Sequence, residues 1–532
     1  MLSRRRFLAG LGAVTAGAAT LPILDACGAN TGSTSTAWAK APVTFVFAAD
    51  GDADHIDPAL VSDFESFQVT RNCYDPLVQV DDAHLKLVPW LATSWETSAD
   101  GTTTTLHLRD GVMFSDGSKF DAAAAKLNLD RVMALQQGPY YVISNFKSVS
   151  VVDPMTIAIT TQTPDTYVAA HLVKVGMVSA QAVNDHKTAS DPWATQFFQS
   201  NVVGCGPYKM QSWQKGSQIT LVKNDKWWKG WQPGSIDRVI IKPMDDTASR
   251  VELVQSGGAD FTDLWPIADA LRVGRSKGFT LIEANTFDTD PVFYMNTQKP
   301  PFNNLQLRQA AQYAFDYKSM ISYYKGNATI PTGPMPADFT GGSKDLKPFA
   351  QDLDKARSLL KQSGVDPSKI NVNFLLSAGS EDFSVGATVM QASLKKLGIG
   401  VSINQVPTTE LLSRYANAQT SGDMTDIIQS PFTLDPSLFM SFYLPGNTFN
   451  LAMFNDPYVT SNLQKVGTLT DKNQRDTLLN TLQHYIRDKA PCVWGARPKT
   501  LVPVPDHVTG YVMQATDYRW TMRFDMLRIR AH

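Results

Sequence analysis

The sequence predicts an α/β fold with more than one domain. Short apolar or β-branched runs have the pattern of strands, and two later segments repeat apolar residues every three or four positions, as helices do. One of these helical segments lies between two strand-like runs, which indicates a β-α-β unit. The chain has 532 residues, of which 43% are hydrophobic. Because a single core stops growing at roughly 250–300 residues, we expect two or three domains.

The first element along the chain is an export signal. Ser3–Leu8 (SRRRFL) resembles a twin-arginine signal, and an uncharged, Gly/Ala-rich run follows it from Ala9 to Leu24. This run is too short and too glycine-rich to cross about 30 Å of hydrocarbon. We therefore predict a cleaved signal peptide over residues 1–26 and no membrane span.

The end of this segment resembles a bacterial lipoprotein signal. Leu24 stands three positions before Cys27 and Ala26 directly precedes it, while Asp25 occupies a place where a small or apolar residue is typical. We predict that the Cys27 thiol is diacylated, because two acyl chains anchor stably where one binds only marginally. The alternative is a soluble exported protein with an incidental cysteine. We expect residues 27–40 to be a flexible tether, since Ser, Thr and Gly dominate them.

Strands come first in the remainder of the chain, and helices later. The expected strands are Val43–Phe47, Thr102–Arg109, Thr156–Thr160 and Asp237–Lys242. Apolar residues at helical spacing predict one helix over Leu307–Ile321 and a second over Phe383–Leu397. The strand-like runs Ile370–Leu376 and Gly398–Ile403 flank the second helix, and the three form the predicted β-α-β unit.

Charge and cysteine usage exclude several classes of protein. A net charge of −2 supplies no basic field for nucleic acid. Besides Cys27 the chain has three cysteines, Cys73, Cys205 and Cys492. Because three is an odd number, at least one thiol stays outside any disulfide, and the sequence does not show which two cysteines would form one. Neither their spacing nor the eight scattered histidines resemble a metal site.

Two motifs start like known sites but do not complete them. Asp50–Asp54 (DGDAD) begins like a calcium loop, yet His55 and Val61 stand where an EF-hand needs Gly and Glu. We interpret it as a solvated acidic loop. Ser393–Lys396 (SLKK) matches the Ser-x-x-Lys of penicillin-recognising enzymes without their other motifs, so we expect its serine and last lysine on a polar helix flank. No nucleophile-elbow, Walker or dinucleotide-binding motif occurs, which fits a protein without catalysis.

Eight stretches, in order along nearly the whole chain, carry a family resemblance. They are Ile56–Leu60, Asn72–Val78, Pro89–Glu96, Leu106–Phe114 with Asp116-Gly117, Gly204–Tyr208, Asn224–Trp228, Asn296–Phe302 and Arg308–Ala310. Any one of these stretches alone is weak evidence of kinship. With all eight in order, the chain resembles the extracytoplasmic solute-binding proteins of ABC importers, in the oligopeptide, dipeptide and nickel group (family 5).

This resemblance implies a periplasmic-binding-protein-like fold of type II, cluster C, with two α/β lobes, a hinge and a third, inserted subdomain. It implies discontinuous domains, which are lobe I over 41–80, 204–290 and 499–532, inserted subdomain II over 81–203, and lobe II over 291–498. A ligand would bind between the lobes.

The resemblance also implies the activity and the partners. We expect a monomer that captures a small-molecule or peptide ligand with high affinity and delivers it to the permease and ATPase subunits of an importer. It would need no cofactor, metal, catalytic residue or nucleic acid, and would sit at the outer face of the cell membrane or in the periplasm. The alternative is an orphan ligand sensor, a signalling receptor or a hydrolase on the same fold.

Candidate ligand-binding residues follow by register from the family. They are Phe64, Tyr140, Leu264, Trp265, Gln429, Ser430, Phe432 and Trp494. For each aromatic residue the alternative is core packing, because pockets and cores share an apolar composition.

Two positions depart from the family pattern. Peptide-binding relatives hold the ligand ammonium with an Asp three residues before an acidic-Pro pair, and here Asp435-Pro436 is preceded at that distance by Phe432. Dipeptide-binding relatives offer an Arg to the ligand carboxylate, where this chain has Ser377. Because burying an unpaired charge is costly, we expect free dipeptides to be disfavoured. The predicted ligand is a blocked or apolar peptide, an oligosaccharide or another metabolite.

Overall fold

The computed structural model describes residues 37–40, 42–377, 381–415, 417–447, 449–514 and 521–531. The predicted signal peptide, the lipidation site Cys27 and the tether before residue 37 lie outside the described residues. The chain separates into residues 1–36 and a second unit, residues 37–532, to which all the elements below belong. Within the described ranges, no helix is both long and apolar enough to span a bilayer.

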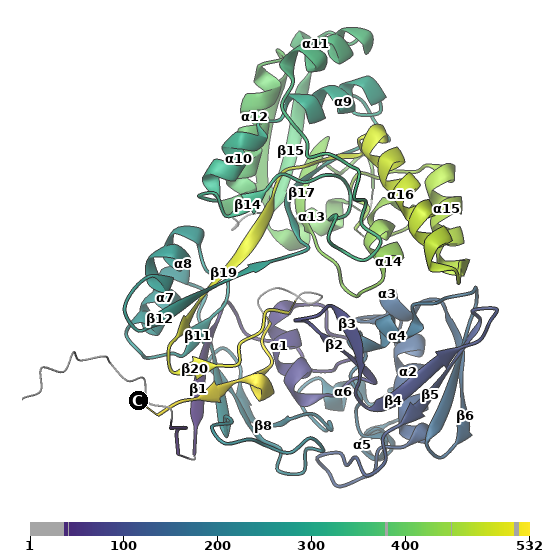
Figure 1. The fold of residues 1–532 in the computed structure, drawn as a ribbon, viewed down its shortest axis with the longest axis vertical. Coiled ribbons are helices and arrows are strands. Elements are labelled where there is room, and N and C mark those ends of the chain that lie inside the picture. Colours follow the sequence, from purple (N-terminus) through teal and green to yellow (C-terminus); the bar gives the residue numbers. More distant parts are fainter. Residues whose placement is uncertain are drawn as a thin grey trace, which may run out of the picture. The chain divides into compact units, whose positions relative to one another are not determined.

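The first lobe is built on a five-stranded sheet in the order β11-β1-β10-β9-β8 (Figure 1). Its strands are β1 (Thr44–Ala49), β8 (Tyr208–Gln214), β9 (Gln218–Lys223), β10 (Arg238–Pro243) and β11 (Phe261–Thr262). β1 is parallel to both β10 and β11, so distant segments must meet to form the sheet. Val502, Val504 and Phe524 pack in the same core, so the C-terminal segment completes the first lobe.

Helix α1 (Phe64–Cys73) belongs to the first lobe and carries residues of the site described below. It starts at Asp63, whose carboxylate accepts a hydrogen bond from the Ser66 amide at 2.8 Å, as an N-cap does. Val69 and Cys73 are buried in the core of the first lobe. Because Phe67 and Arg71 are four residues apart, their side chains share another face of the helix.

The inserted subdomain, from β4 to α6, has its own antiparallel sheet in the order β4-β5-β7-β6. These strands are β4 (Ala92–Thr97), β5 (Thr103–Leu108), β6 (Phe146–Asp153) and β7 (Thr156–Thr161), and the hairpin β2 (Val78–Asp81) and β3 (Lys86–Pro89) precedes them. The helical elements are α2 (Ala122–Leu135), α3 (Tyr140–Ile143), α4 (Val168–His171), the 3-10 turn Leu172–Lys174, α5 (Ala180–His186) and α6 (Thr195–Phe198). The sheet and α2 enclose a separate core.

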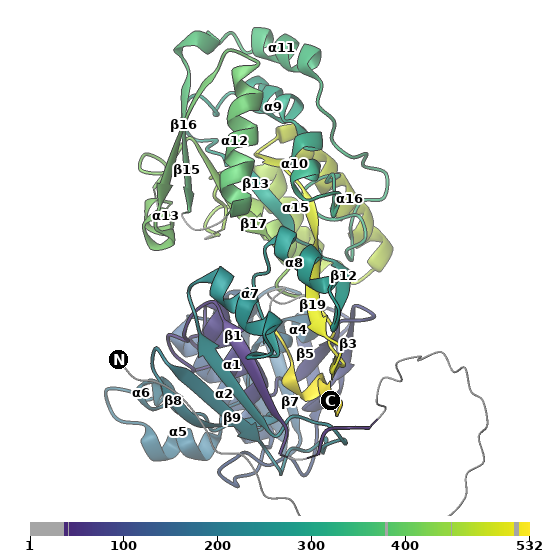
Figure 2. The same ribbon diagram turned by 90° about the vertical axis from the view of Figure 1, so that its left-hand side faces the viewer.

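Two antiparallel strands carry the chain from the first lobe to the second and back (Figures 1 and 2). They are β12 (Phe279–Asn285) and β19 (Arg497–Pro505), paired from Phe279–Pro505 to Asn285–Lys499. Helix α7 (Thr247–Gln255) precedes this crossing, and α8 (Ile267–Gly274) packs on both strands. These two strands are the connection between the lobes at which the predicted hinge would lie.

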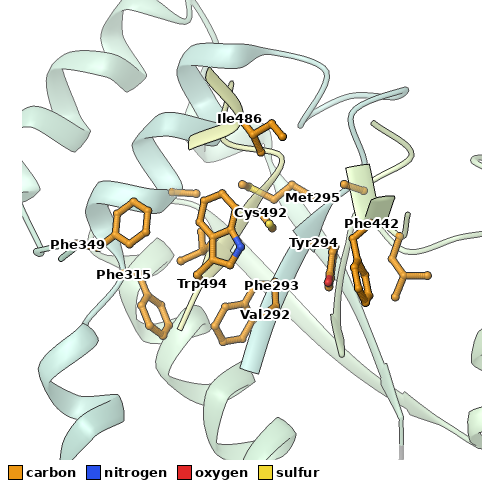
Figure 3. Packing of buried hydrophobic residues seen from close by; sticks show 14 of the residues in the cluster. Val292, Phe293, Tyr294, Met295, Phe315, Phe349, Phe442, Ile486, Cys492 and Trp494 are labelled. Carbon is orange, nitrogen blue, oxygen red and sulfur yellow. The ribbon is translucent and has the colours of Figure 1, made fainter. Parts of the chain in front are cut away.

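The second lobe contains a mixed sheet in the order β16-β15-β17-β13-β18. Its strands are β13 (Thr289–Met295), β15 (Asn371–Ser377), β16 (Gly400–Val406), β17 (Met424–Gln429) and β18 (Cys492–Trp494), and the short β14 (Ala328–Thr329) pairs with β19. The helices are α9 (Leu305–Ala314), α10 (Tyr317–Tyr323), α11 (Leu353–Gln362), α12 (Glu381–Lys395), α13 (Thr408–Arg414), α14 (Pro436–Met440), α15 (Pro457–Thr468) and α16 (Lys472–Lys489). Every residue of β13 is buried, and Figure 3 shows Val292, Phe293 and Tyr294 beside Trp494 in the core.

The predicted β-α-β unit is confirmed, and the predicted long helix is wrong. β15 and β16 are parallel, with α12 between them. The stretch expected to form one helix over Leu307–Ile321 instead forms α9 and α10. Phe315 is extended, with φ −62° and ψ 136°, and the Asp316 carboxylate accepts from the Ser319 amide and starts the second helix. A capping residue inside the apolar stripe thus ends one helix and starts another, while the spacing of the apolar residues continues unchanged.

The three cysteines outside the signal are buried free thiols. Cys73 lies in the core of the first lobe, Cys205 in the core of the inserted subdomain and Cys492 in that of the second lobe. Each of the three cores holds one of these thiols. None of the three possible disulfides between them therefore forms in the described part of the chain. Burial raises the pKa of each thiol, which keeps it protonated and unreactive.

Candidate functional site

A cavity of about 150 Å³ is lined by residues of both lobes and of the inserted subdomain. Its walls combine cations with aromatic rings, and those used below are Phe67, Arg71, Tyr141, Lys174, Phe432 and Phe449. A molecule bound here would touch α1, the inserted subdomain and the second lobe at once. It would therefore bind the closed arrangement of the lobes more tightly than an open one.

Two cations face this cavity, Arg71 from α1 and Lys174 from the 3-10 turn after α4. Burial lowers the pKa of Arg71 to about 10. Burial and then the charge of Arg71 hold the pKa of Lys174 well below its ordinary value. The Lys174 ammonium lies 5.0 Å from the centroid of the Phe67 ring, and Arg71 donates to the Gln514 side-chain oxygen. Among the described residues that line the cavity, none carries a carboxylate.

Phe432 links the second lobe to the inserted subdomain. Its ring packs edge-on against Tyr141, with centroids 5.4 Å apart, and lies 5.6 Å from the ring of Phe449. Phe442 lies behind it, with centroids 6.1 Å apart. Such aromatic pairs contribute more to stability than their buried area alone. The Phe432 ring therefore forms part of the cavity wall and also stabilises the contact between the second lobe and the inserted subdomain.

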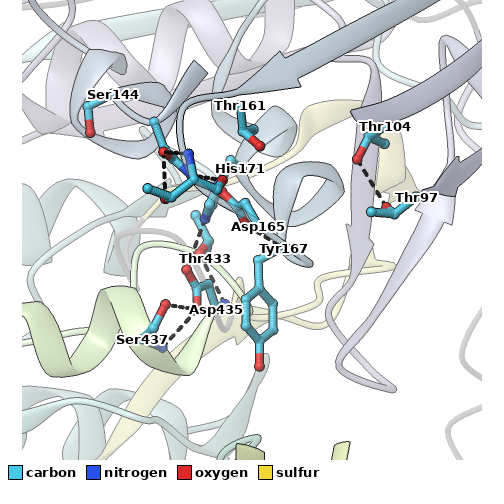
Figure 4. A network of polar contacts seen from close by, with 12 residues as sticks. Thr97, Thr104, Ser144, Thr161, Asp165, Tyr167, His171, Thr433, Asp435 and Ser437 are labelled. Carbon is cyan, nitrogen blue, oxygen red and sulfur yellow. Dashed lines mark hydrogen bonds and ion pairs between the residues drawn. The ribbon is translucent and has the colours of Figure 1, made fainter. Parts of the chain in front are cut away.

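A buried polar bridge joins the same two parts of the molecule (Figure 4). His171 Nε2 lies 2.9 Å from Asp435 Oδ2, and His171 Nδ1 lies 3.6 Å from Asp165 Oδ2. Asp435 also caps α14 by accepting from the amide and hydroxyl of Ser437. Burial alone lowers the pKa of His171, but the hydrogen bond to Asp435 and the charge of Asp165 outweigh it and raise that pKa. We call His171, Asp165 and Asp435 the His171 bridge.

The structure places the predicted ligand-binding residues in several different environments. Phe432 lines the cavity. Tyr140 is next to the lining residue Tyr141 and packs on the core of the inserted subdomain. Phe64 instead lines a second, smaller cavity beside Asp263.

The remaining predicted residues lie away from the larger cavity. Leu264, with a left-handed φ of 48°, precedes Trp265, which packs on a small cluster of the first lobe. Gln429 and Trp494 are fully buried around Tyr443, whose hydroxyl donates to Gln429 Oε1 at 3.1 Å and accepts from Trp494 Nε1 at 3.0 Å. The Ser430 hydroxyl donates to Asp288 at 2.6 Å. Gln429 ends β17 and Trp494 ends β18, so these two residues belong to the second-lobe sheet, and Phe432 follows three residues after β17.

The cations Arg71 and Lys174 were not predicted from the sequence. One signal for Lys174 was available, because it is the only lysine in the otherwise apolar run 168–178 (VAAHLVKVGMV), which also holds His171. A charged residue inside such a run needs a partner or a site. Arg71 gave no comparable signal, since a basic residue in the last turn of a helix is common.

The two incomplete motifs have ordinary structural roles. In the acidic loop, Asp50 pairs with Arg250 at 2.5 Å, and Asp52 accepts from the Trp213 indole at 3.0 Å. The prediction that Ser393 lies on a polar flank is wrong, because Ser393 is fully buried and donates to the Val389 carbonyl at 2.7 Å. A serine hydroxyl that donates a hydrogen bond to a carbonyl of its own helix can be buried, because it does not need water as a hydrogen-bond partner.

The fold and this chain's sequence match a family of known proteins. The model for bacterial extracellular solute-binding proteins, family 5 (middle region), matches residues 86–450. Heme-binding protein A of Haemophilus influenzae is 28% identical over 95% of this chain and 97% of that protein. The probable D,D-dipeptide-binding periplasmic protein DdpA of Escherichia coli is 27% identical over 87% of this chain and 90% of its own length.

A solved structure agrees with these relatives. The ABC transporter-associated periplasmic binding protein DppA of Helicobacter pylori, in complex with the peptide STSA, superposes with a TM-score of 0.79. It is 26% identical and covers 92% of this chain and 98% of its own. The predicted two-lobed α/β fold and the predicted family are thereby confirmed, while the residue boundaries of the lobes stay a prediction. The chain belongs to family 5 of the bacterial extracellular solute-binding proteins.

Proposed function

We propose that this protein is the extracytoplasmic receptor of an ABC importer, which captures one small organic or peptide-like molecule and passes it unaltered to a permease and its ATPase. The observation that carries the proposal is the cavity, because both lobes and the inserted subdomain line it. Membership of family 5 supports the same role. Its relatives include proteins named for heme, a D,D-dipeptide and a peptide ligand.

The mechanism we propose is closure of the lobes about β12 and β19. A ligand shifts that equilibrium only by its difference in affinity for the two states. Phe432 of the second lobe and α1 of the first lobe line one cavity, so a ligand that contacts both would favour the closed arrangement. The His171 bridge adds a second closed-state contact. The closed receptor is then the form that a permease recognises.

The chemistry of the cavity supports a ligand without a free ammonium. Phe432, at the position where peptide-binding relatives carry an ammonium-binding Asp, lines the cavity with its ring. The lining residues in the described part of the chain include no Asp or Glu. Isothermal titration with dileucine should therefore show no binding in the micromolar range. Micromolar or tighter binding of this free dipeptide would contradict the proposal.

We further propose twin-arginine export and a lipid anchor at Cys27. The arginine pair, the uncharged run and the spacing of Leu24, Ala26 and Cys27 support it. The anchor would keep the receptor near its permease and raise the effective concentration there. Radiolabelled palmitate should label the wild-type protein and not Cys27→Ala, with Cys73→Ala as the labelled control. Equal labelling of all three would refute lipidation at Cys27.

Native mass spectrometry of the protein as purified tests the receptor role. The expected result is one molecule bound per chain, with the same mass before and after incubation. A changed mass would indicate turnover and an enzyme. A bound molecule whose uptake is unaffected when the gene is deleted would indicate a sensor instead of an importer component.

A further inference from the structure

We infer that the lobes close with the uptake of one proton, held on the ring of His171, so that acidic surroundings favour the closed receptor. This inference rests on the lobe closure of the proposed function and adds a pH-sensitive device to it. The ring lies between a carboxylate of the inserted subdomain and a carboxylate of the second lobe, which together form the His171 bridge.

Each ring nitrogen of His171 faces a carboxylate oxygen. Nε2 lies 2.9 Å from Asp435 Oδ2, and Nδ1 lies 3.6 Å from Asp165 Oδ2. A neutral imidazole has one N–H group and one lone pair, so it donates to one of these carboxylates and turns the lone pair toward the other. The protonated ring presents an N–H group to both. The geometry therefore suits the charged ring better than the neutral one.

The two carboxylates belong to parts of the molecule that would separate when the lobes open. Asp165 is fixed within the inserted subdomain, where it accepts from the Tyr167 amide at 2.8 Å. Asp435 is fixed within the second lobe, where it accepts from the amide and the hydroxyl of Ser437, both at 2.7 Å. Opening would leave His171 with Asp165 alone. The closed state therefore binds the proton more tightly, and by linkage a bound proton favours closure.

Burial strengthens this coupling, because each side chain of the His171 bridge is less than a tenth exposed. Helix α16 adds the charges of Arg475 and Asp476 beside Tyr167, whose pKa is raised first by burial, so that its hydroxyl stays neutral. Arg475 donates to the Thr166 hydroxyl at 3.2 Å and lies 5.0 Å from the Tyr167 ring. The groups that raise the pKa of His171 against its burial are the two carboxylates of the bridge.

The His171 bridge lies apart from the lining of the cavity. None of its three residues is a lining residue. The bridge instead joins the end of α4 to the start of α14 (Figure 4). Protonation of His171 would therefore act on the closure of the lobes and not on a group that touches the ligand.

The distance between the lobes, measured against pH on protein free of ligand, tests the inference. Dyes for fluorescence energy transfer are attached at Lys147→Cys on β6 and Gln464→Cys on α15, which are exposed positions. The three cysteines outside the signal are buried, and Cys27→Ala removes the fourth, so the introduced thiols are the ones that react. The short-distance population should be larger at pH 5.5 than at pH 9.

The size of the response is limited by the single proton. The ratio of closed to open molecules should fall by up to about ten-fold for each pH unit as His171 titrates, because one pKa unit corresponds to a factor of ten. Equal populations at pH 5.5 and pH 9, or a larger closed population at pH 9, would overturn the inference.

Variants assign the response to the bridge. His171→Gln does not titrate and should remove the response, and Asp435→Asn, which keeps an acceptor without the charge, should weaken it. His84→Gln removes an exposed histidine paired with Asp81 and should respond as wild type. Far-UV circular dichroism verifies that each variant is folded. A response that persists unchanged in Asp435→Asn or in folded His171→Gln would also overturn the inference.

Other titrations and the proposed function are separable from this result. Burial raises the pKa of Asp263 to about 7, but this residue follows β11 in the first lobe, so a response that it causes would persist in His171→Gln. A lobe distance that does not change with pH would remove the proton coupling and leave the importer role intact. Normal uptake in a deletion strain would remove the importer role, while the pH response would still be measured on the purified protein.

Discussion

At the scale of single residues, Phe432 has two roles, because its ring lines the cavity and packs against Tyr141 of the inserted subdomain. Phe432→Ala should weaken binding of the co-purified ligand by up to about ten-fold, the loss expected for one aromatic contact of about 0.5–1.5 kcal/mol. Titration calorimetry measures the change. Tyr458→Ala removes an exposed ring on α15 and is the control. Unchanged affinity in Phe432→Ala would mean that the ligand binds elsewhere.

Gly204 illustrates a residue required by close packing. A Cβ at this position would lie 2.1 Å from the Cys73 carbonyl oxygen and 2.5 Å from the Tyr74 ring. Gly204→Ala should therefore lower the free energy of unfolding by about 1–3 kcal/mol or more, as overpacking does. Chemical denaturation measures it. At Gly51 a Cβ would meet only Glu65 at 3.6 Å, so Gly51→Ala should change little. Equal effects of the two variants would contradict this account.

The residues of the site were only partly predictable. Phe432 was assigned by register with the family, from its place three residues before the Asp435-Pro436 pair. Gln429 and Trp494 were assigned to the ligand by the same register, and the structure places them in a buried triad with Tyr443. Sequence patterns do not tell a buried hydrogen-bonded residue from a lining one, because both are polar groups in apolar surroundings. Lys174 was missed because its neighbours in space come from other elements.

At the scale of elements, the His171 bridge connects the end of α4 to the start of α14. His171 faces Asp165 and Asp435, and Tyr167, Arg475 and Asp476 surround the same contact. A histidine whose pKa is raised in the folded state adds stability that is full below the unfolded pKa of about 6.5 and is lost as the pH rises through the folded value.

We therefore expect His171→Gln to lower the free energy of unfolding more at pH 5.5 than at pH 9. At pH 5.5 the loss should be about 1–3 kcal/mol, as for a buried hydrogen bond to a charged group. Guanidinium titrations at the two pH values measure it. His84→Gln removes an exposed histidine paired with Asp81 and should change little at either pH. A loss that grows from pH 5.5 to pH 9 would refute the assigned sign.

Element types followed from periodicity more reliably than element ends did. The β-α-β unit was predicted because the strand pattern and the helix pattern are each visible within a short stretch of sequence. The break between α9 and α10 was missed because the apolar stripe continues through it, and only the capping bond of Asp316 marks the new start. The pairing of β12 with β19 joins segments more than 200 residues apart, and no local pattern predicts such a contact.

At the scale of the whole molecule, ligand binding should bring the lobes together about β12 and β19. Small-angle X-ray scattering should show a smaller radius of gyration when the co-purified ligand is added back to protein from which it has been removed. The physical reason is that both lobes line the cavity, so a ligand that contacts both stabilises the closed state. Phe432→Ala at the same ligand concentration is the control, because its ring lines the cavity from the second lobe. Binding proved by calorimetry without compaction would contradict lobe closure.

The two-lobed architecture was predictable only by resemblance. Composition and length indicated several domains, and periodicity indicated α/β elements. The order of the sheets depends on contacts such as β1 with β10 and β11, which unite three distant segments. The family resemblance predicted that the lobes are discontinuous in sequence, because its motifs identify the fold as a whole, but it did not predict the order of the strands.

The return of the chain through β19 sets the order in which the protein can assemble. Val502, Val504 and Phe524 are part of the first-lobe core, so that lobe lacks interior side chains until the end of the chain has left the ribosome. The second lobe is built from one continuous stretch and has no such requirement. Synthesis from the N-terminus usually lets the earliest domain fold first. Here the lobe that begins the chain is the last to be finished.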